Sequence, residues 1–202
     1  MSGKNATDFR VKIATGLKAV SSEQWDACAN PLPARRAANG SLPTHDTSES
    51  FNPFASHAFL SALEESGCVS GRTGWAPAHL LVEDGDTRLV GAAPCYLKSH
   101  SLGEYVFDHA WADAYARAGG HYYPKLQVSV PFTPVTGPRL LLAPGASATR
   151  ARAALVAGLR ALRADTDASS IHLTFLPEED SARLASDGFL LRTGQQFHWF
   201  NE

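Results

Sequence analysis

The 202-residue sequence has few cysteines and no long apolar run. Its three cysteines, Cys28, Cys68 and Cys95, form no C-x-x-C pair, as expected of free thiols in a reducing compartment. No segment reaches the roughly 20 apolar residues that span a bilayer. The N-terminal residues 1–17 also lack the apolar core of a signal peptide. These absences predict a cytoplasmic protein without a membrane span.

A strong net charge and several common catalytic motifs are also missing. The formal net charge of −2 gives no basis for non-specific nucleic-acid binding, which needs a basic surface to displace counterions. No P-loop and no G-x-S-x-G nucleophile elbow occur, so the sites that these motifs build are not expected. Hydrophobic residues make up 44% of the chain and charged residues 19%, which predicts a globular protein of one large domain or two small ones.

The order of the strand and helix patterns indicates a mixed α/β fold with helices on the faces of a sheet. Alternating or short apolar runs predict strands at 9–13, 78–83, 88–97, 125–130, 139–142 and 171–175, and a kinked last strand within 189–200. Capping residues and helical periodicity predict helices at 22–29, 52–66, 104–118, 147–164 and 177–187. Residues 1–7 are expected to be disordered and residues 30–50 to form a mobile loop.

Two positions in the predicted strands carry more specific information. Asp84-Gly85 joins the runs 78–83 and 88–97 and predicts a hairpin, because both residues tolerate the left-handed conformation. Pro94 lies inside the second run and predicts a bulge or an edge there, since proline cannot donate to a strand ladder.

An aromatic stripe follows from the spacing in the 104–118 helix. Phe107, Trp111 and Tyr115 recur every four residues and therefore share one face of the helix. We expect this face to pack in the core, the alternative being a platform for a ligand.

Three longer segments of the sequence resemble one family. They are NPFASHAFLSALEESG (52–67), FDHAWADAYARAGGHYYPKLQVSVPFTPVTGPRLL (107–141) and GFLLRTGQQFHW (188–199). Together they resemble the bacterial FemAB-like proteins, predicted N-acyltransferases of the GNAT superfamily. The resemblance implies a GNAT-like, mixed and splayed sheet with helices on both faces, formed by residues 1–202 as a single domain. Family members carry two such domains in tandem, so the chain resembles their N-terminal half, and a second GNAT domain is expected after residue 202.

The resemblance also implies a function and its reactants. The complete protein is expected to transfer an acyl or aminoacyl group, from acyl-CoA or an aminoacyl donor, to an amine on a cell-wall precursor such as that of peptidoglycan. A GNAT domain that holds acyl-CoA has a glycine-rich turn whose N–H groups bind the pyrophosphate. At the matching position, residues 139–146 contain one glycine and Pro144, which has no N–H. We therefore expect no cofactor to be bound by this half, and its cofactor-binding residues are unknown.

The most reactive-looking residues of the chain are Asp108 and His109. A carboxylate beside an imidazole can raise its basicity, as acyl transfer to an amine requires of a general base, so we predict that both are catalytic. The alternative is a solvated helix face on which Asp113 pairs with Arg117. His109 and Asp113 would give a metal only two ligands, so no metal site is predicted.

Four further residues are predicted to bind the acceptor. Lys125 and Gln127 lie on one face of a predicted strand, where they would grip an anionic group and an amide; the alternative is a solvent-exposed sheet face. Phe132 and Thr136 belong to the proline-rich segment 131–138, which is predicted to form a pocket rim or, alternatively, a bulge that bends the sheet.

Two function classes remain open from the sequence. In the first, the chain is the acceptor-side half of an N-acyltransferase. In the second, it is a non-catalytic docking module that pairs with another copy or a partner domain through the exposed edge of its C-terminal strand. A hydrolase that uses Asp108 and His109 is a third and weaker alternative.

Overall fold

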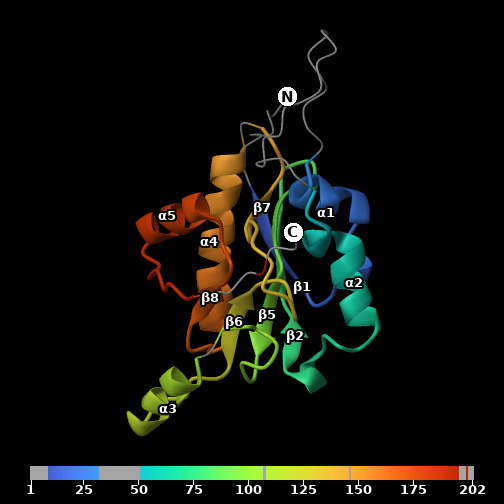
Figure 1. Cartoon of the computed structure of the whole chain (residues 1–202). Helices are drawn as coiled ribbons and strands as arrows, with labels where there is room; N and C mark the ends of the chain where they lie inside the picture. The colour runs from blue at the N-terminus through green and yellow to red at the C-terminus, as the bar shows by residue number, and fades with distance from the viewer. Residues whose placement is uncertain (1–8, 32–50, 107, 146, 196–198, 200–202) are drawn as a thin grey trace.

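The computed structural model describes residues 9–31, 51–106, 108–145, 147–195 and 199. Within these residues, eight strands form two four-stranded sheets, and helices lie on both sides of them (Figure 1). The predicted mixed α/β fold is therefore confirmed. The predicted disordered start and most of the predicted 30–50 loop lie outside the described residues.

The first sheet has the strand order β1-β3-β4-β7, and each strand is antiparallel to its neighbours. Its strands are β1 (Arg10–Ala14), β3 (His79–Glu83), β4 (Leu89–Ala93) and β7 (Leu141–Leu142). β3 and β4 form the predicted hairpin, which is closed by a hydrogen bond from the Asp84 N–H to the Arg88 carbonyl.

The second sheet has the order β2-β5-β6-β8. Its strands are β2 (Trp75–Pro77), β5 (Cys95–Lys98), β6 (Lys125–Val128) and β8 (Ile171–Leu173). β6 and β8 run parallel, whereas the other pairs are antiparallel. The parallel pair is possible because the long helix α4 (Ala148–Asp165) connects the two regions of the chain.

The two sheets splay apart at Pro94, which separates β4 from β5. Proline has no N–H for the ladder, but its carbonyl accepts a hydrogen bond from the Ser129 N–H at 3.2 Å. Beyond this point, β6 pairs with β5 in the second sheet, whereas β7 pairs with β4 in the first. The bulge or edge predicted at Pro94 is thus the joint of a splayed sheet.

Helices cover the two sides of the first sheet (Figure 1). α4 lies on one side and buries Leu155 and Leu159 against Leu80 and Val90. α1 (Ser22–Ala29) and α2 (His57–Glu65) lie on the other side, where Trp25 is fully buried. Short 3-10 turns are η1 (Leu17–Ala19), η3 (Pro53–Ala55) and η4 (Gly71–Thr73). Among the described residues, no helix is both long and apolar enough to cross a bilayer.

The helix predicted to begin at Asn52 begins five residues later. Asn52 caps only the short turn η3, through a 3.1 Å hydrogen bond from the Phe54 N–H to its Oδ1 atom. Ser56 then adopts an extended conformation and caps α2 itself. The prediction was wrong at this boundary because two capping residues follow each other and the sequence does not show which one starts the helix.

The predicted core position of the aromatic stripe is wrong. α3 spans His109–Arg117 and contains no buried residue; Trp111 is 59% exposed and Tyr115 is 47% exposed. Figure 1 shows that α3 projects from one end of the molecule, away from the sheets. Phe107 lies outside the described residues. Spacing shows that aromatic residues share a face of a helix, but it does not show that another element covers this face.

The C-terminal segment also differs from the prediction. α5 (Glu178–Ser186) forms as expected. At its C-terminal end, the Phe189 N–H donates a hydrogen bond to the Leu184 carbonyl. Residues 189–195 form no strand, and Leu190 is 95% exposed. An apolar run becomes a strand only where a neighbouring strand offers hydrogen bonds, and this segment has none within the described residues. The other part of the predicted strand, at 196–200, lies outside them except for Trp199.

Candidate functional site

One face of the second sheet is polar although it is buried. Strand register places Lys98 beside Lys125, and Tyr96 beside Gln127. Trp75 on β2 and His172 on β8 extend the same face to both edges of the sheet. We call the side chains of these residues the polar face: Trp75, Tyr96, Lys98, Lys125, Gln127 and His172. Residues of the opposite face, such as Leu126 and Val128, pack in the apolar core.

Lys125 is the centre of a buried charged cluster at one end of the polar face. Its Nζ atom donates to Ser101 Oγ at 2.9 Å, to Glu104 Oε2 at 2.7 Å and to Asp108 Oδ2 at 2.6 Å. The Lys125 side chain is 0% exposed. With Lys98, these charged residues form the charged cluster: Lys98, Glu104, Asp108 and Lys125. The cluster joins the segment 99–108, which leads into α3, to the sheet.

The two carboxylates of the charged cluster differ in proton affinity. Burial alone would raise the pKa of Asp108, but hydrogen bonds from Lys125 and from the Tyr122 hydroxyl, at 2.8 Å, lower it to about 2. Burial raises the pKa of Glu104, and Lys125 opposes this rise only in part. Asp108 is therefore the permanently ionised partner of Lys125 at neutral pH.

Lys98 lies next to the cluster in an unusual environment. Its Nζ atom is 3.5 Å from the centre of the Trp75 ring, 3.2 Å from the Leu102 carbonyl and 3.8 Å from Glu104 Oε1. Burial, reinforced by the nearby positive charge of Lys125, lowers the pKa of Lys98 to about 7. Close to neutral pH, this amine therefore exchanges between its charged and neutral forms.

The other half of the polar face is uncharged and incompletely hydrogen bonded. We call Tyr96 and Gln127, together with Ser129, which follows β6 on the same side, the neutral group. Gln127 Nε2 donates to Thr174 Oγ1 at 3.0 Å. Among the described residues, the Tyr96 hydroxyl, Gln127 Oε1 and Ser129 Oγ have no hydrogen-bond partner although all three atoms are buried. A buried polar group without a partner costs about 1–3 kcal/mol, so such atoms indicate a place for water or a ligand.

His172 is the histidine of the polar face. Its Nε2 atom lies 2.8 Å from Ser170 Oγ, and its ring is 6.0 Å from the Tyr122 ring, edge to face. Burial, with Lys125 nearby, lowers the pKa of His172 to about 4. The imidazole is thus neutral at physiological pH, with one nitrogen that can donate and one that can accept a hydrogen bond.

Another histidine, His79, is fully buried, and both of its ring nitrogens make structural hydrogen bonds. Its Nδ1 atom accepts the Cys95 N–H at 3.2 Å, so the proton resides on Nε2, which donates to Glu64 Oε1 at 2.7 Å. Both ring nitrogens are used, and no lone pair remains to act as a base.

A loop crosses the polar face from one edge of the second sheet to the other. At one end, the Phe132 ring lies 5.4 Å from the Trp75 ring, and the Phe132 N–H donates to the Gly103 carbonyl. At the other end, the buried Arg139 guanidinium donates to the carbonyls of Val135 and Thr174. The loop 131–138 therefore covers the neutral group.

The structure brings some of the predicted site residues together and separates others. Lys125 and Gln127 share one face of β6, as predicted, but the face is buried, so the alternative of a solvent-exposed face is wrong. Asp108 joins Lys125 in the charged cluster, whereas the neighbouring His109 is exposed, and no hydrogen bond connects the two among the described residues.

The remaining predicted residues lie on the covering loop. Phe132 is 40% exposed and has a φ angle of 61°, and Thr136 is exposed. Asp113 and Arg117 are both exposed on α3 and form no ion pair with each other in the described structure.

Sequence reasoning missed Lys98, Glu104, Tyr122 and His172. A signal existed for Lys98, because Cys95-Tyr96-Leu97-Lys98 alternates apolar and polar side chains and so places Tyr96 and Lys98 on one strand face. No such signal existed for Glu104, which reaches the cluster from an irregular segment.

Neither the cysteines nor a metal centre adds to this site. Cys28 and Cys95 are buried, which raises their pKa values to about 11 and about 12, so both thiols are protonated and unreactive. Among the described residues, no three His, Cys, Asp or Glu side chains are grouped to hold a metal ion.

The described residues of the turn between β7 and α4 differ from a glycine-rich, pyrophosphate-binding turn. Pro144 lacks an N–H, and the Ala148 N–H already donates to the Gly145 carbonyl at 3.2 Å. Ser147 begins α4 without a side-chain cap. Two of the N–H groups that a glycine-rich turn would offer a phosphate are thus absent, at Pro144, or already used, at Ala148.

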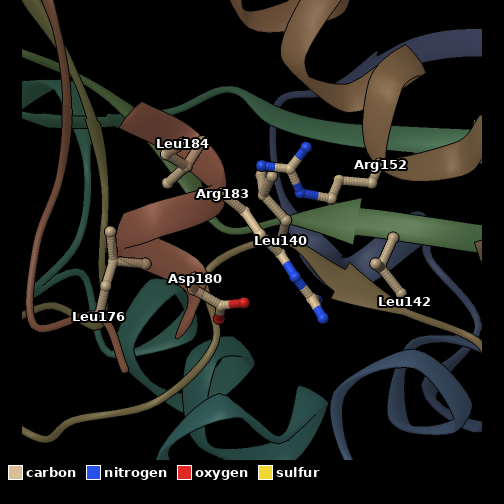
Figure 2. Close-up of a pocket in the computed structure, with 7 residues that line it drawn as sticks. All are labelled: Leu140, Leu142, Arg152, Leu176, Asp180, Arg183 and Leu184. Carbon is tan, nitrogen blue, oxygen red and sulfur yellow. The ribbon is translucent and has the colours of Figure 1, made fainter. Parts of the chain in front are cut away.

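Beside this turn, a narrow pocket lies between β7, α4 and α5 (Figure 2). It is lined by four leucines and three charged residues: Leu140, Leu142, Leu176, Leu184, Arg152, Asp180 and Arg183. Arg152 is paired with Asp187 at 2.7 Å, and Arg183 is paired with Glu179. The volume is about 20 Å³, which is room for about one water molecule. The pocket as it stands does not admit an acyl chain.

Comparisons with known proteins give one family and one solved structure. A family model, FemAB_like, described as peptidoglycan biosynthesis/recognition, matches residues 16–202. The search of curated proteins gives no significant match. The crystal structure of an acetyltransferase from Trypanosoma brucei is similar over 96% of this chain and 100% of that chain, at 12% identity and a TM-score of 0.45. A similarity this low supports no inference about chemistry.

Proposed function

Because the chain belongs to the FemAB-like family, we propose that it is the acceptor-side domain of an N-acyltransferase. Such an enzyme transfers an acyl or aminoacyl group to an amine. The family description refers to peptidoglycan, and the proposed acceptor is therefore an amine of a cell-wall precursor. A GNAT-like mechanism is part of this proposal.

The observation that carries the proposal is the neutral group. Three buried polar atoms without partners, on Tyr96, Gln127 and Ser129, lower the stability of the fold. Proteins retain such atoms where water or a substrate meets them. Gln127 Oε1 can accept a hydrogen bond from an amine, and the two hydroxyl groups can donate to a carbonyl oxygen.

In the reaction, the acceptor nitrogen attacks the acyl carbonyl carbon. An N–C amide bond forms, the bond from the carbon to the leaving group breaks with its electron pair, and the nitrogen loses a proton to a base. The neutral group orients the amine, and the imidazole of His172, which burial keeps neutral, can accept a hydrogen bond from it on the same face. Asp108 and Lys125 hold the segment 99–108 in place.

Access requires the loop 131–138 to move, because it covers the neutral group. Phe132 and Thr136, exposed on this loop, would meet the acceptor first, in keeping with their predicted role as a pocket rim. Because Pro144 has no N–H and the Ala148 N–H is already used, the start of α4 offers a pyrophosphate fewer donors than a glycine-rich turn would, and we propose that another domain or chain holds the acyl donor.

A second candidate function is a non-catalytic docking module. It is favoured by the exposed side chains of Leu190 and Leu191, which extend after α5 without a covering element in the described structure. A docking function would not explain why the buried polar atoms of the neutral group have no hydrogen-bond partner.

The donor part of the proposal is tested by calorimetry of this chain with acetyl-CoA. We expect no heat of binding at micromolar concentrations. A micromolar dissociation constant would show that this chain itself holds the cofactor and would refute this part of the proposal.

The acceptor part is tested by the affinity for a lysine-containing cell-wall precursor peptide. Gln127→Leu removes the unpartnered oxygen and should weaken binding about tenfold, the equivalent of one good hydrogen bond. Gln195→Leu, at an exposed position, is the matched control and should bind like the wild type. Equal affinity of all three proteins would refute the assignment of the acceptor site.

A further inference from the structure

A second, open pocket lies between α3 and the C-terminal end of α4, on the outer side of the charged cluster. Its volume of about 380 Å³ lies in the range of small-molecule sites, roughly 300–1,000 Å³. The residues that matter for binding are Tyr115, His121, Tyr123, Arg163, Asp167 and Ser169. The function proposed above uses none of them.

The aromatic wall of this pocket is fixed in position. A Cβ atom on Gly120 would lie 2.5 Å from the Tyr115 ring, so the ring rests directly on the glycine backbone. Its edge-to-face neighbour, at 6.2 Å, is Tyr122. The Tyr123 hydroxyl is held by Ser101 Oγ at 2.7 Å. Since Tyr115 remains 47% exposed, it offers a ring that a ligand can cover at a low cost in side-chain entropy.

The polar groups of the pocket are balanced in charge and available for hydrogen bonds. Arg163 donates one N–H to the Ser169 carbonyl at 3.2 Å and retains others. Asp167, with a left-handed φ of 51°, is fixed by a hydrogen bond from its N–H to the Ala164 carbonyl. Arg163 and Asp167 form no ion pair with each other in the described structure, and the Asp167 carboxylate and His121 ring have no partner there.

We propose that this pocket binds an uncharged, polyhydroxylated ring, that is, a saccharide. The apolar C–H face of a pyranose ring would lie on Tyr115, and its hydroxyl groups would donate to Asp167 and accept from Arg163. One cation and one anion match a neutral ligand. A zwitterionic peptide end would also match these charges, but it would make no use of the fixed tyrosine ring. The proposal does not depend on acyl transfer.

Titration of the complete chain with cellobiose and chitobiose, followed by NMR of labelled backbone amides, tests the proposal. We expect saturable shifts at residues 115–123 and 163–169, with millimolar affinity. Tyr115→Ala should weaken binding about tenfold. Trp111→Ala is the matched control, because Trp111 is exposed on the same helix but does not line the pocket, and it should leave the affinity unchanged.

Tyr115→Leu keeps the apolar bulk of the side chain, removes the flat ring and should weaken binding as much as Tyr115→Ala. Three results would overturn the proposal. The first is the absence of saturable shifts with either disaccharide. The second is an equal loss of affinity in Tyr115→Ala and Trp111→Ala. The third is binding of glycylglycine in the same pocket in preference to the disaccharides, which would assign it to zwitterions.

Discussion

The charged cluster and the neutral group, at the two ends of the polar face, differ in how their buried polar side chains are paired. In the charged cluster, every ionised group has a group of opposite charge within 4.0 Å, although Glu104 Oε1 and Asp108 Oδ1 accept no hydrogen bond in the described structure. In the neutral group, three buried polar atoms have no partner in the described structure. Pairing of opposite charges fixes the segment 99–108 to the sheet, whereas uncharged side chains whose buried atoms have no partner mark the place that we propose for a ligand. The catalytic function is therefore expected from the less charged half.

The largest effect is expected for Lys125→Met, which removes the central cation. Glu104 and Asp108 would then be buried without their main partner, and breaking a buried pair in this way costs about 3–5 kcal/mol. Urea denaturation measures the loss in the free energy of unfolding. Lys12→Met is the control, because Lys12 pairs with Glu83 on the surface and should cost about 0–1 kcal/mol. Similar losses in both variants would show that the buried cluster contributes no more to stability than a surface ion pair.

A smaller change in the free energy of unfolding should distinguish Tyr122, which donates to the charged cluster, from Tyr96 of the neutral group. Tyr122→Phe removes a hydroxyl that donates to the Asp108 carboxylate and should cost about 1.5–3 kcal/mol, the contribution of a hydrogen bond to a charged group. Tyr96→Phe removes an unpartnered buried hydroxyl and should instead raise the stability, by up to about 1–3 kcal/mol. Thermal unfolding of the two variants measures the difference. A loss in Tyr96→Phe as large as that in Tyr122→Phe would show that a buried water satisfies Tyr96.

Because the pKa of Lys98 is lowered in the folded protein, the free energy of unfolding should depend on pH above neutrality. Between about pH 7 and 10.5, the unfolded chain binds a proton on Lys98 that the folded chain does not. The free energy of unfolding should therefore rise with pH in this window, by about 1–2 kcal/mol after relaxation of the network. As the pH approaches 9, the raised pKa values of Cys28 and Cys95 oppose this trend, and those of Tyr96 and Tyr122 do so above pH 10, so the comparison ends at about pH 8. Lys98→Met should show no such rise, and equal slopes in both proteins would contradict the assignment.

The sequence predicted the fold better than the site. Alternation placed Lys125 and Gln127 on one strand face, and Pro94 marked the joint between the sheets, because both signals are local properties of the backbone. The burial of Lys125 depends on Glu104 and Asp108, which reach it from an irregular segment, and local patterns do not report such contacts. The same limit explains α3, where spacing gave the stripe of Trp111 and Tyr115 correctly but not its exposure.

The smallest effect on stability is expected for His109, the exposed histidine that the sequence predicts to be catalytic. His109→Ala should change the free energy of unfolding by less than about 0.5 kcal/mol, because the side chain is exposed. The rate of acylation of a precursor peptide by the complete enzyme distinguishes the roles. His172 lies on the polar face beside Gln127, so His172→Ala should lower turnover about tenfold through the loss of one hydrogen bond to the amine, whereas His109→Ala should keep it. A loss of turnover in His109→Ala alone would instead establish the pair Asp108 and His109 as the catalytic site, with a side-chain rotation that brings the exposed imidazole to the buried carboxylate.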